Sequence, residues 1–531
     1  MVEIEPTPHR FPGGLTLPGH KAALQTAPIE VLPLPDELVL PLRQHPGAPA
    51  LPLVAVGQRV EAGERIAAAP DPLTADLHAP AEATVVALER RALIGAPDAQ
   101  GQCLVLACAA PGSRGEPPAA DPGAGAIDAP AAQIRRRLAA AGVAGQGGAA
   151  FPAATKAGVA SASQPRLLIL NGAECEPYVA CDEALLRTAA AAVLRGAEWL
   201  RRAAGATAGV IAIEADKAAA LAAMAAALAA TGWTHWRLQR LPVRYPAGAE
   251  RQLIQLVTGE ELGAGRLPAE AGIVCHNVGT AYAAWQALEQ DRAMTHRVVT
   301  VTGGGVARPA NVLAPIGTPL ATLIEFCGGY TALAHRLIVG GPLTGVAVAD
   351  DARPITKGTH CVLVAAPADL SNPGPERACI RCGDCVAVCP ARLLPQQLLQ
   401  AARRDEDDEL ARQRLFDCIE CGLCAHVCPS HIPLVAHYRR AKALVRGRQR
   451  DAAAAAEAKA RYEARERRLA AEAAELAAAR EARRPGRPAA PSEVGQAQDR
   501  RAAIQAALDR ARARAQQKPA DAPPDEEPPA S

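Results

Sequence analysis

The pattern of hydrophobic and polar positions changes several times along the chain, which predicts a multidomain protein. Between residues 31 and 110, short Val- and Leu-rich segments are separated by Pro and Gly, a spacing typical of small β-strands in a sandwich or barrel. After a Gly-, Ala- and Pro-rich linker at 111–130, helical and strand-like segments alternate, which predicts an α/β domain with a largely parallel sheet. The predicted helices are 134–142, 182–205 and 216–232, and the predicted strands are 166–171, 209–214 and 237–246.

The two ends of the chain differ from these domains in amino-acid composition. The first 30 residues are rich in Pro and Gly, and we expect their FPGG segment, Phe11–Gly14, to be exposed. Residues 446–531 begin as an Ala/Arg/Glu-rich helix with little apolar face and then become rich in Pro, Ala and Asp. This predicts a free helix with many ion pairs and a disordered end, whereas a coiled coil is disfavoured because heptads of large apolar residues are missing.

Composition narrows the class of protein. The 531 residues are 49% hydrophobic but only 3% aromatic, so Ala, Leu and Val must fill the cores. A net charge of +2 gives no global field that would attract nucleic acid, and we expect no nucleic-acid partner. The N-terminus lacks the basic and apolar regions of a signal peptide, and no apolar run is long enough to span a bilayer. We therefore expect a cytoplasmic protein whose contact with a membrane is indirect.

Two cysteine runs carry the strongest chemical signal. CIRCGDCVAVCP begins at Cys379 and CIECGLCAHVCP begins at Cys418, and both follow C-x-x-C-x-x-C-x-x-x-C-P, the run that binds a [4Fe–4S] cluster. Structural zinc sites are the alternative, but zinc takes four ligands and does not require two duplicated runs that end in Pro. The other seven cysteines are scattered and odd in number, which favours buried thiols in a reducing compartment.

In two-cluster ferredoxins, the last cysteine of each run binds the cluster of the other run. This predicts one [4Fe–4S] cluster on Cys379, Cys382, Cys385 and Cys428, and a second on Cys418, Cys421, Cys424 and Cys389. The segment between the runs contains two helical patterns, so we expect a helix-rich ferredoxin variant.

A glycine-rich loop, GVAGQGGAAFPAATK at Gly142–Lys156, is the sharpest signal outside the cysteine runs. It contains G-x-G-x-x-A, but a Rossmann dinucleotide loop requires a strand before the glycines, and here a helix is predicted before them. The loop is rich in backbone amides and is followed by Lys156, so it suits a phosphate or a flat ring. In isolation, an ordinary glycine-rich turn would be the better explanation of this loop.

Other loops follow the predicted strands of the same domain. NGAECEPY begins at Asn171, at the carboxyl end of a strand, where α/β sheets bind ligands, and it carries Glu174 and Glu176. YPAGAERQL begins at Tyr245 and CHNVGTAYA begins at Cys275, each a glycine-containing loop after a strand.

The order of these motifs resembles the C subunit of the Rnf electron-transport complex over nearly the whole chain. The central part is similar to the flavin-carrying, NADH-oxidising subunit of respiratory complex I, although Gln146, Ala173 and Ala249 replace that family's usual Arg, Asp and Glu. Residues 31–110 resemble a barrel-sandwich hybrid of biotinyl and lipoyl carriers, yet no Lys lies between Lys21 and Lys156 to act as a swinging arm. That domain is expected to be structural or a docking surface.

The resemblance implies the site residues of the α/β domain. Glu174 and Glu176 would be catalytic, and FMN and nicotinamide would be bound by Gly145, Gly147, Lys156, Asn171, Glu174, Tyr245, Gly248, Glu250, Asn277 and Thr280. The implied protein passes electrons from NADH through FMN to two [4Fe–4S] clusters, and then to integral membrane subunits and to ferredoxin or another one-electron acceptor. It would lie peripherally on the cytoplasmic face of the bacterial inner membrane.

Two alternatives remain for the function: a non-catalytic iron–sulfur relay scaffold, or a soluble flavin/iron–sulfur dehydrogenase with another donor. The expected fold class is multidomain α/β and α+β. The expected parts are an N-terminal extension at 1–30, a barrel-sandwich hybrid at 31–110, the linker at 111–130, a Rossmann-like flavin domain at 131–296, a β-grasp (SLBB-like) module at 297–365, a helical two-cluster ferredoxin domain at 366–445, and a charged helical and disordered tail at 446–531.

Overall fold

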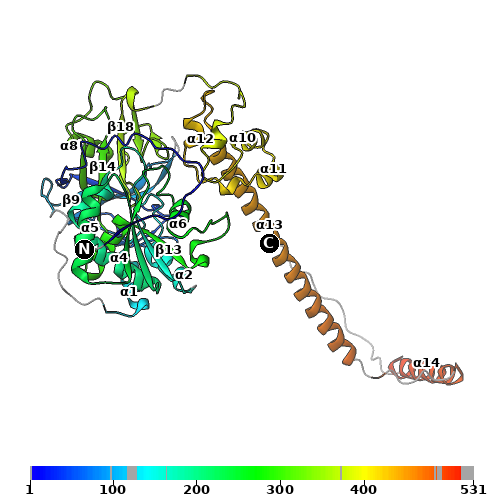
Figure 1. Cartoon of the computed structure of the whole chain (residues 1–531). Helices are drawn as coiled ribbons and strands as arrows, with labels where there is room; N and C mark the ends of the chain where they lie inside the picture. The colour runs from blue at the N-terminus through cyan, green and yellow to red at the C-terminus, as the bar shows by residue number, and fades with distance from the viewer. Residues whose placement is uncertain are drawn as a thin grey trace. The chain divides into compact units, whose positions relative to one another are not determined.

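The computed structural model divides the chain into two compact units, Met1–Val445 and Arg446–Ser531 (Figure 1). It describes residues 3–95, 99–115, 128–162, 164–370, 374–483, 486 and 493–515. The linker prediction at 111–130 therefore lies largely outside the described residues. We refer to the parts of the first unit as the hybrid domain (31–110), the α/β domain (131–296), the β-grasp module (297–365) and the cluster domain (366–445).

The α/β domain is built on a five-stranded sheet in which every pairing is parallel, as predicted. Its strands alternate between two cores: on β10, Leu168 and Leu170 face one core, and Leu167 and Ile169 face the other. The strand order is β1 (Ile4–Pro6), β12 (Trp236–Leu241), β11 (Ala208–Glu214), β10 (Leu167–Gly172) and β13 (Ile273–Asn277). The helices are α1 (Ala131–Ala140), α2 (Ala153–Ala162), α3 (Cys181–Thr188), α4 (Ala190–Ala204), α5 (Ala218–Thr231), α6 (Glu250–Thr258) and α7 (Val278–Glu289), with a 3₁₀ turn at Pro268–Ala271.

Two predictions for this domain are corrected. The single helix predicted at 182–205 is broken at Ala189, where the backbone leaves the helical region. The Thr188 hydroxyl donates a hydrogen bond to Ala184 O at 2.7 Å, a local bond of the kind that bends helices. The edge strand β1 comes from the N-terminal extension, for which no strand was predicted.

The hybrid domain consists of two small antiparallel sheets around one apolar core, in agreement with the predicted short strands. One sheet has the order β3 (Glu37–Pro41), β9 (Gln100–Cys108), β8 (Ala83–Ala92) and β5 (Arg59–Val60). The other has the order β4 (Leu51–Pro52), β6 (Arg65–Ala68) and β7 (Leu77–His78).

The β-grasp module is a mixed six-stranded sheet with one helix, α8 (Leu320–Phe326), as predicted. Its edge strand β2 belongs to the N-terminal extension and pairs in parallel with β15. The order is β17 (Val346–Val348), β16 (Arg336–Val339), β18 (Cys361–Ala365), β14 (His296–Thr302), β15 (Ala310–Pro315) and β2 (Ile29–Val31), and a 3₁₀ turn follows at Pro367–Asp369.

The described residues of the cluster domain are helical and contain no strand, which agrees with the helix-rich prediction. The expected exposure of the FPGG segment was wrong, because Phe11 is only 7% exposed and Gly14 N–H donates to Val388 O at 3.0 Å. The elements are α9 (Asp384–Ala387), α10 (Pro395–Arg404), α11 (Asp407–Arg412), the 3₁₀ turn Leu415–Asp417, α12 (Leu423–His426) and the start of α13 (Leu434–Ala482).

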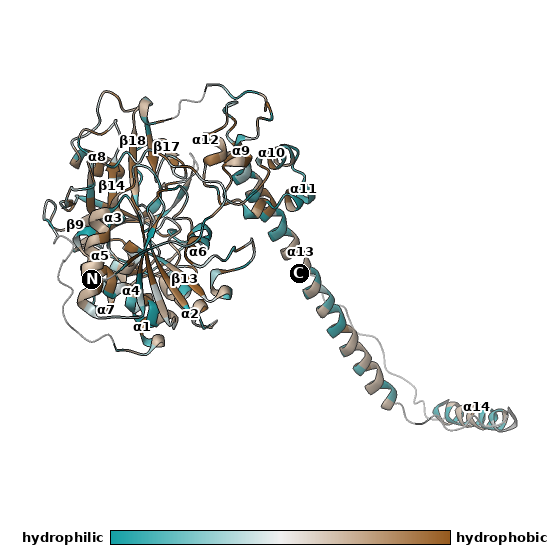
Figure 2. Ribbon diagram, in the orientation of Figure 1, coloured by the Kyte–Doolittle hydropathy of each residue, from teal (hydrophilic) through white to brown (hydrophobic). Residues whose placement is uncertain are grey.

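The second unit contains the rest of α13 and a further helix, α14 (Glu493–Ala515). Every residue from 448 to 483 is exposed, and Figure 2 shows this stretch as mostly hydrophilic to neutral. The predicted ion pairs are present at i,i+4, for example between Arg461 and Glu457 at 3.5 Å. Only one helix was predicted in this tail, so α14 corrects the prediction, and the residues after Ala515 lie outside the described part of the chain. None of the described helices is both long enough and apolar enough to cross a membrane.

Candidate functional site

A cavity of about 230 Å³ opens at the carboxyl edge of the parallel sheet, where the strand-end loops were predicted to bind a ligand. Three parts of the first unit line it: the α/β domain, Thr344 and His360 of the β-grasp module, and Ile419 and Cys421 of the cluster domain. The predicted site residues in its lining are Gly147, Asn171, Glu174, Glu176, Tyr245, Gly248 and Asn277.

The glycine loop follows helix α1, so the rejection of a Rossmann dinucleotide loop is confirmed. Its base is closed by a hydrogen bond from Gly145 N–H to Phe151 O at 2.8 Å. At its exposed tip, the backbone N–H groups of residues 147–149 donate no hydrogen bond of ordinary geometry to any described residue. Three neighbouring free N–H groups are a donor set that fits a phosphate.

Asn171, at the end of β10, orders the neighbouring strand-end loops. Its side-chain amide donates to Gly248 O at 2.9 Å, and its carbonyl oxygen accepts from Ala173 N–H at 3.2 Å. A Cβ at Gly248 would lie 3.2 Å from both Ala173 Cβ and Cys175 Sγ, so a larger residue there would crowd this wall of the cavity. Small residues on this side leave room for a flat ring.

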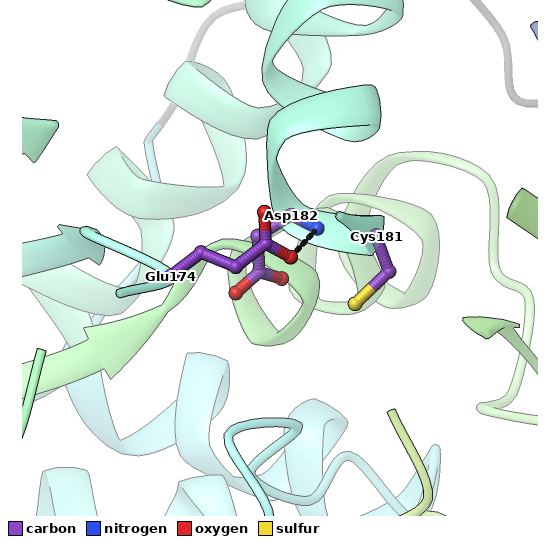
Figure 3. Close-up of side chains that lie close together, drawn as sticks. All are labelled: Glu174, Cys181 and Asp182. Atoms are coloured by element: carbon purple, nitrogen blue, oxygen red, sulfur yellow. Dashed lines mark hydrogen bonds between the residues drawn. The ribbon is translucent and has the colours of Figure 1, made fainter. Parts of the chain in front are cut away.

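Glu174 caps a helix at the edge of the cavity. Its carboxylate accepts the backbone N–H groups of Asp182 at 2.7 Å and Glu183 at 3.1 Å, at the N-terminus of α3. Figure 3 shows Glu174 beside Asp182 and Cys181. Burial and the Glu174 carboxylate raise the pKa of Asp182 to about 7.

The ligand atoms of Glu174, Cys181 and Asp182 lie within 4.8 Å of one another, which raises the question of a metal ion. Both Glu174 oxygens already accept helix N–H groups, and burial together with Asp182 raises the pKa of the Cys181 thiol well above its usual value. The trio is therefore better described as a capped helix start than as a metal site.

Asn277 and Thr280 stand at the start of α7, whose N-terminal end points a partial positive charge toward the cavity. Asn277 Oδ1 accepts Gly279 N–H at 2.8 Å, and its amide donates to the Asp182 carboxylate. Thr280 is fully buried, and its hydroxyl accepts Gln146 N–H at 2.9 Å. In this structure Thr280 supports the glycine loop and does not line the cavity.

Lys156 and Glu250 lie outside the cavity lining and form an ion pair of 2.7 Å. Burial lowers the pKa of Lys156, but the Glu250 carboxylate more than offsets this effect, so the pKa of Lys156 lies above its usual value. Lys156 thus keeps its positive charge at neutral pH. The same charge, together with burial, lowers the pKa of the neighbouring His276 to about 3.

Glu176 and Tyr245 connect the cavity to the other parts of the first unit. The Glu176 carboxylate accepts Leu343 N–H at 3.0 Å and Thr344 N–H at 2.8 Å, together with the Thr344 hydroxyl. The Tyr245 hydroxyl donates to Cys421 O at 2.7 Å. One wall of the cavity is therefore held against the second cysteine run.

The eight predicted iron ligands gather in two groups within the cluster domain. Cys389 lines one small cavity of about 20 Å³ together with Cys418, Cys421 and Cys424. Burial raises the pKa of the Cys385 thiol, and the other three predicted ligands, Cys382, Cys379 and Cys428, lie close enough to raise this pKa further. Each group takes its fourth thiol from the other run, so the arrangement fits crossed ligation of two clusters.

The thiols themselves suit a bound cluster. Burial and the neighbouring Cys418 and Cys389 thiols raise the pKa of Cys421 to about 12, so without iron this thiol stays protonated. A coordinated iron replaces such protons. Gly383 and Gly422, at φ +91° and +84°, allow the tight turns that bring the thiols together.

Several residues of the cavity were not among the predicted site residues, notably Gln146, Cys175, Asp182, Thr344 and His360. Asp182 could have been found from its place at a helix start soon after a strand end. Thr344 and His360 come from the β-grasp module, and no local pattern indicated that they would reach this edge.

Four protein families match consecutive parts of the chain. Residues 9–109 match the RnfC barrel-sandwich hybrid domain, and residues 138–286 match the Nuo51 FMN-binding domain. Residues 298–347 match the SLBB domain, and residues 378–432 match the 4Fe-4S dicluster domain. The chain is thus a mixed α/β multidomain protein with these four kinds of domain.

Among solved structures, an NAD+-reducing [NiFe]-hydrogenase in the H2-reduced state aligns with 59% of this chain and 63% of that chain. The alignment has a TM-score of 0.42 and 21% sequence identity.

Close relatives are described as the C subunit of an ion-translocating oxidoreductase complex. The one from Pseudomonas aeruginosa is 41% identical over 471 residues, which is 87% of this chain and 59% of the relative's own length. The one from Rhodobacter capsulatus is 36% identical over 437 residues, 82% of this chain and 83% of the relative. These matches confirm the resemblance, and the chain belongs to the family of C subunits of the ion-translocating oxidoreductase complex.

Proposed function

We propose that this chain is the peripheral electron-input subunit of a membrane-bound, ion-translocating NADH:ferredoxin oxidoreductase. Electrons would pass from NADH through FMN to two [4Fe–4S] clusters and on to integral membrane subunits of the complex. The observation that carries this proposal is that one cavity is lined by both the glycine loop and Cys421. The proposed flavin site and the proposed cluster site would therefore share a wall.

The residues of the chain have separate tasks in this proposal. The free N–H groups of residues 147–149 and the Lys156 ammonium would bind the FMN phosphate, while Asn171 and Gly248 would shape the wall beside the ring. Glu174 and Glu176 would border the nicotinamide. Bound FMN supplies the change from a two-electron donor to one-electron acceptors. The protein would set the separation of the two sites.

The contact between Tyr245 and Cys421 supports a short path from the proposed flavin to the second cysteine run. Tyr245 packs with Cys175, Leu343, Val388 and Leu423 in one apolar cluster between the two sites. The cluster ligated by Cys418, Cys421, Cys424 and Cys389 would therefore be the neighbour of the flavin.

An anaerobic NADH titration followed by visible and EPR spectra tests the proposal. NADH should bleach the flavin absorbance and then reduce both clusters. A protein that contains flavin but is reduced only by another donor would instead favour a soluble dehydrogenase. A protein that binds no flavin, and whose clusters are reduced by dithionite but not by NADH, would favour a relay scaffold.

Glu176 gives a more local prediction. The Glu176→Gln variant should keep its flavin but lose affinity or turnover for NADH by roughly 10- to 150-fold, the effect of one hydrogen bond to a charged group. Its amide oxygen can still accept the N–H groups of Leu343 and Thr344, and its NH2 group would face the Thr344 hydroxyl, so the loop beside the cavity should keep its position and its flavin. Steady-state kinetics and flavin content measure the two effects. Unchanged NADH kinetics would remove Glu176 from the nucleotide site.

The chain would lie on the cytoplasmic face of the bacterial inner membrane, held there by the integral subunits. Ferredoxin or another one-electron carrier would be the final acceptor, and no nucleic acid would take part.

A further inference from the structure

Three carbonyl groups of the glycine loop accept hydrogen bonds from side chains of other parts of the first unit. Lys357 of the β-grasp module donates to Gly142 O at 2.6 Å, and Arg297 donates to Gln146 O at 3.3 Å. His45 of the hybrid domain faces Ala150 O at 2.7 Å through Nδ1. The carbonyls of Gly142, Gln146 and Ala150, on either side of the loop tip, are therefore occupied.

All three donors are buried: Lys357 is 1% exposed, Arg297 is 3% exposed and His45 is 7% exposed. Burial and the nearby Lys357 lower the pKa of His45 to about 4, so its ring is neutral at pH 7. Because a carbonyl only accepts, the proton of the neutral ring must be on Nδ1. A buried donor that is lost would leave its carbonyl without a partner.

The hybrid domain, the β-grasp module and the loop meet at one point. Lys357 also donates to Asp76 O of the hybrid domain at 2.7 Å, and its backbone N–H donates to the Gln44 side chain at 2.9 Å. A Cβ at Gly142 would lie only 2.4 Å from Asp76 O and 2.8 Å from Lys357 Nζ. Only glycine, here at φ +63°, lets the three segments approach so closely.

The contact with Arg297 determines where the first amide at the tip of the loop points, and the contacts with His45 and Lys357 hold the segments on either side of the tip. In a planar trans peptide, the C=O of one residue and the N–H of the next point in opposite directions. With Gln146 O turned inward to Arg297, the N–H of Gly147 must turn outward. This is the first of the three exposed N–H groups at the loop tip.

We propose that the hybrid domain and the β-grasp module clamp the glycine loop into a preformed anion-binding turn, with His45, Arg297 and Lys357 as positioning residues. The ligand is the phosphate monoester of the flavin, so the inference rests on the proposed flavin site. It gives the hybrid domain, which lacks a carrier lysine, a role in cofactor binding. None of these three side chains lines the cavity.

Titration of flavin-free protein with FMN and with riboflavin tests the clamp. His45→Leu should weaken FMN binding by roughly tenfold, the effect of one buried hydrogen bond, and should change riboflavin binding little because riboflavin has no phosphate. His45→Asn should remain within about threefold of the native chain, since the Asn amide can donate from a position close to that of Nδ1.

Val60→Ala is the matched control, because Val60 is buried in the core of the hybrid domain and belongs to no part of the loop contacts. It should lower the melting temperature without changing the affinity for FMN. If Val60→Ala weakened FMN binding as much as His45→Leu, the effect would be general destabilisation and the clamp would be overturned. Equal losses for FMN and riboflavin in His45→Leu would overturn it as well.

Hydrogen exchange of the flavin-free protein separates the clamp from the proposed function. Peptides that cover residues 143–152 should exchange faster in His45→Leu than in the native chain or in His45→Asn. If the native chain bound no FMN but this difference appeared, the clamp would stand and the flavin proposal would fail. If the native chain bound FMN and His45→Leu changed neither exchange nor affinity, the clamp would fail alone.

Discussion

A Lys156→Ala variant should bind FMN roughly 10- to 150-fold more weakly than the native chain and should lose NADH-dependent reduction of its clusters. Lys156 is the only lysine between Lys21 and Lys217, and its ammonium lies 2.7 Å from Glu250 Oε1. Its removal takes away the cation proposed for the phosphate and leaves the Glu250 carboxylate without its partner. Flavin content, an FMN titration and NADH bleaching measure the loss, while dithionite should still reduce the clusters.

The partner residue supplies the control. Glu250→Gln removes the counter-ion but keeps the cation, so this variant should keep its flavin. If the two charges are coupled, the double variant should bind FMN better than Lys156→Ala alone. Full flavin content and full NADH reduction in Lys156→Ala would show that the phosphate site is misplaced, and the relay scaffold would then become the better hypothesis.

Cys428→Ser should damage the cluster of the first run and spare that of its own run, and Cys389→Ser should do the reverse. The reason is the crossed grouping, in which Cys389 shares a small cavity with Cys418, Cys421 and Cys424. Each variant should lower the iron content from about eight to about four atoms per chain if the affected cluster is lost. Iron analysis and EPR of the dithionite-reduced proteins measure this outcome.

Cys103→Ser is a suitable control, because Cys103 is fully buried in the hybrid domain and is not a predicted ligand. It should retain all of the iron. Uncrossed ligation would be the conclusion if Cys428→Ser removed only the cluster of Cys418, Cys421 and Cys424.

The sequence by itself determined the features that depend on near neighbours along the chain. The spacing of the cysteine runs predicted the two groups of thiols, because ligands two residues apart must share one loop. The apolar runs within 166–171 and 209–214, which alternate with predicted helices, predicted buried parallel strands, because such strands are covered on both faces. The resemblance to the flavin-carrying subunit assigned Asn171 and Gly248 to one site, and the two residues are hydrogen-bonded in the structure.

Only the tertiary structure decided which distant segments meet. The N-terminal extension has no strong local pattern, yet it adds β1 to one sheet and β2 to another and packs Phe11 into a core. The partners of the glycine loop, His45 and Lys357, are separated from it by about a hundred residues or more. The free energy of closing a long loop depends only weakly on its length, so separation along the chain does not select which residues meet. The packing of whole domains selects them. No local periodicity encodes them, so the contacts that clamp the glycine loop could be found only in the folded chain.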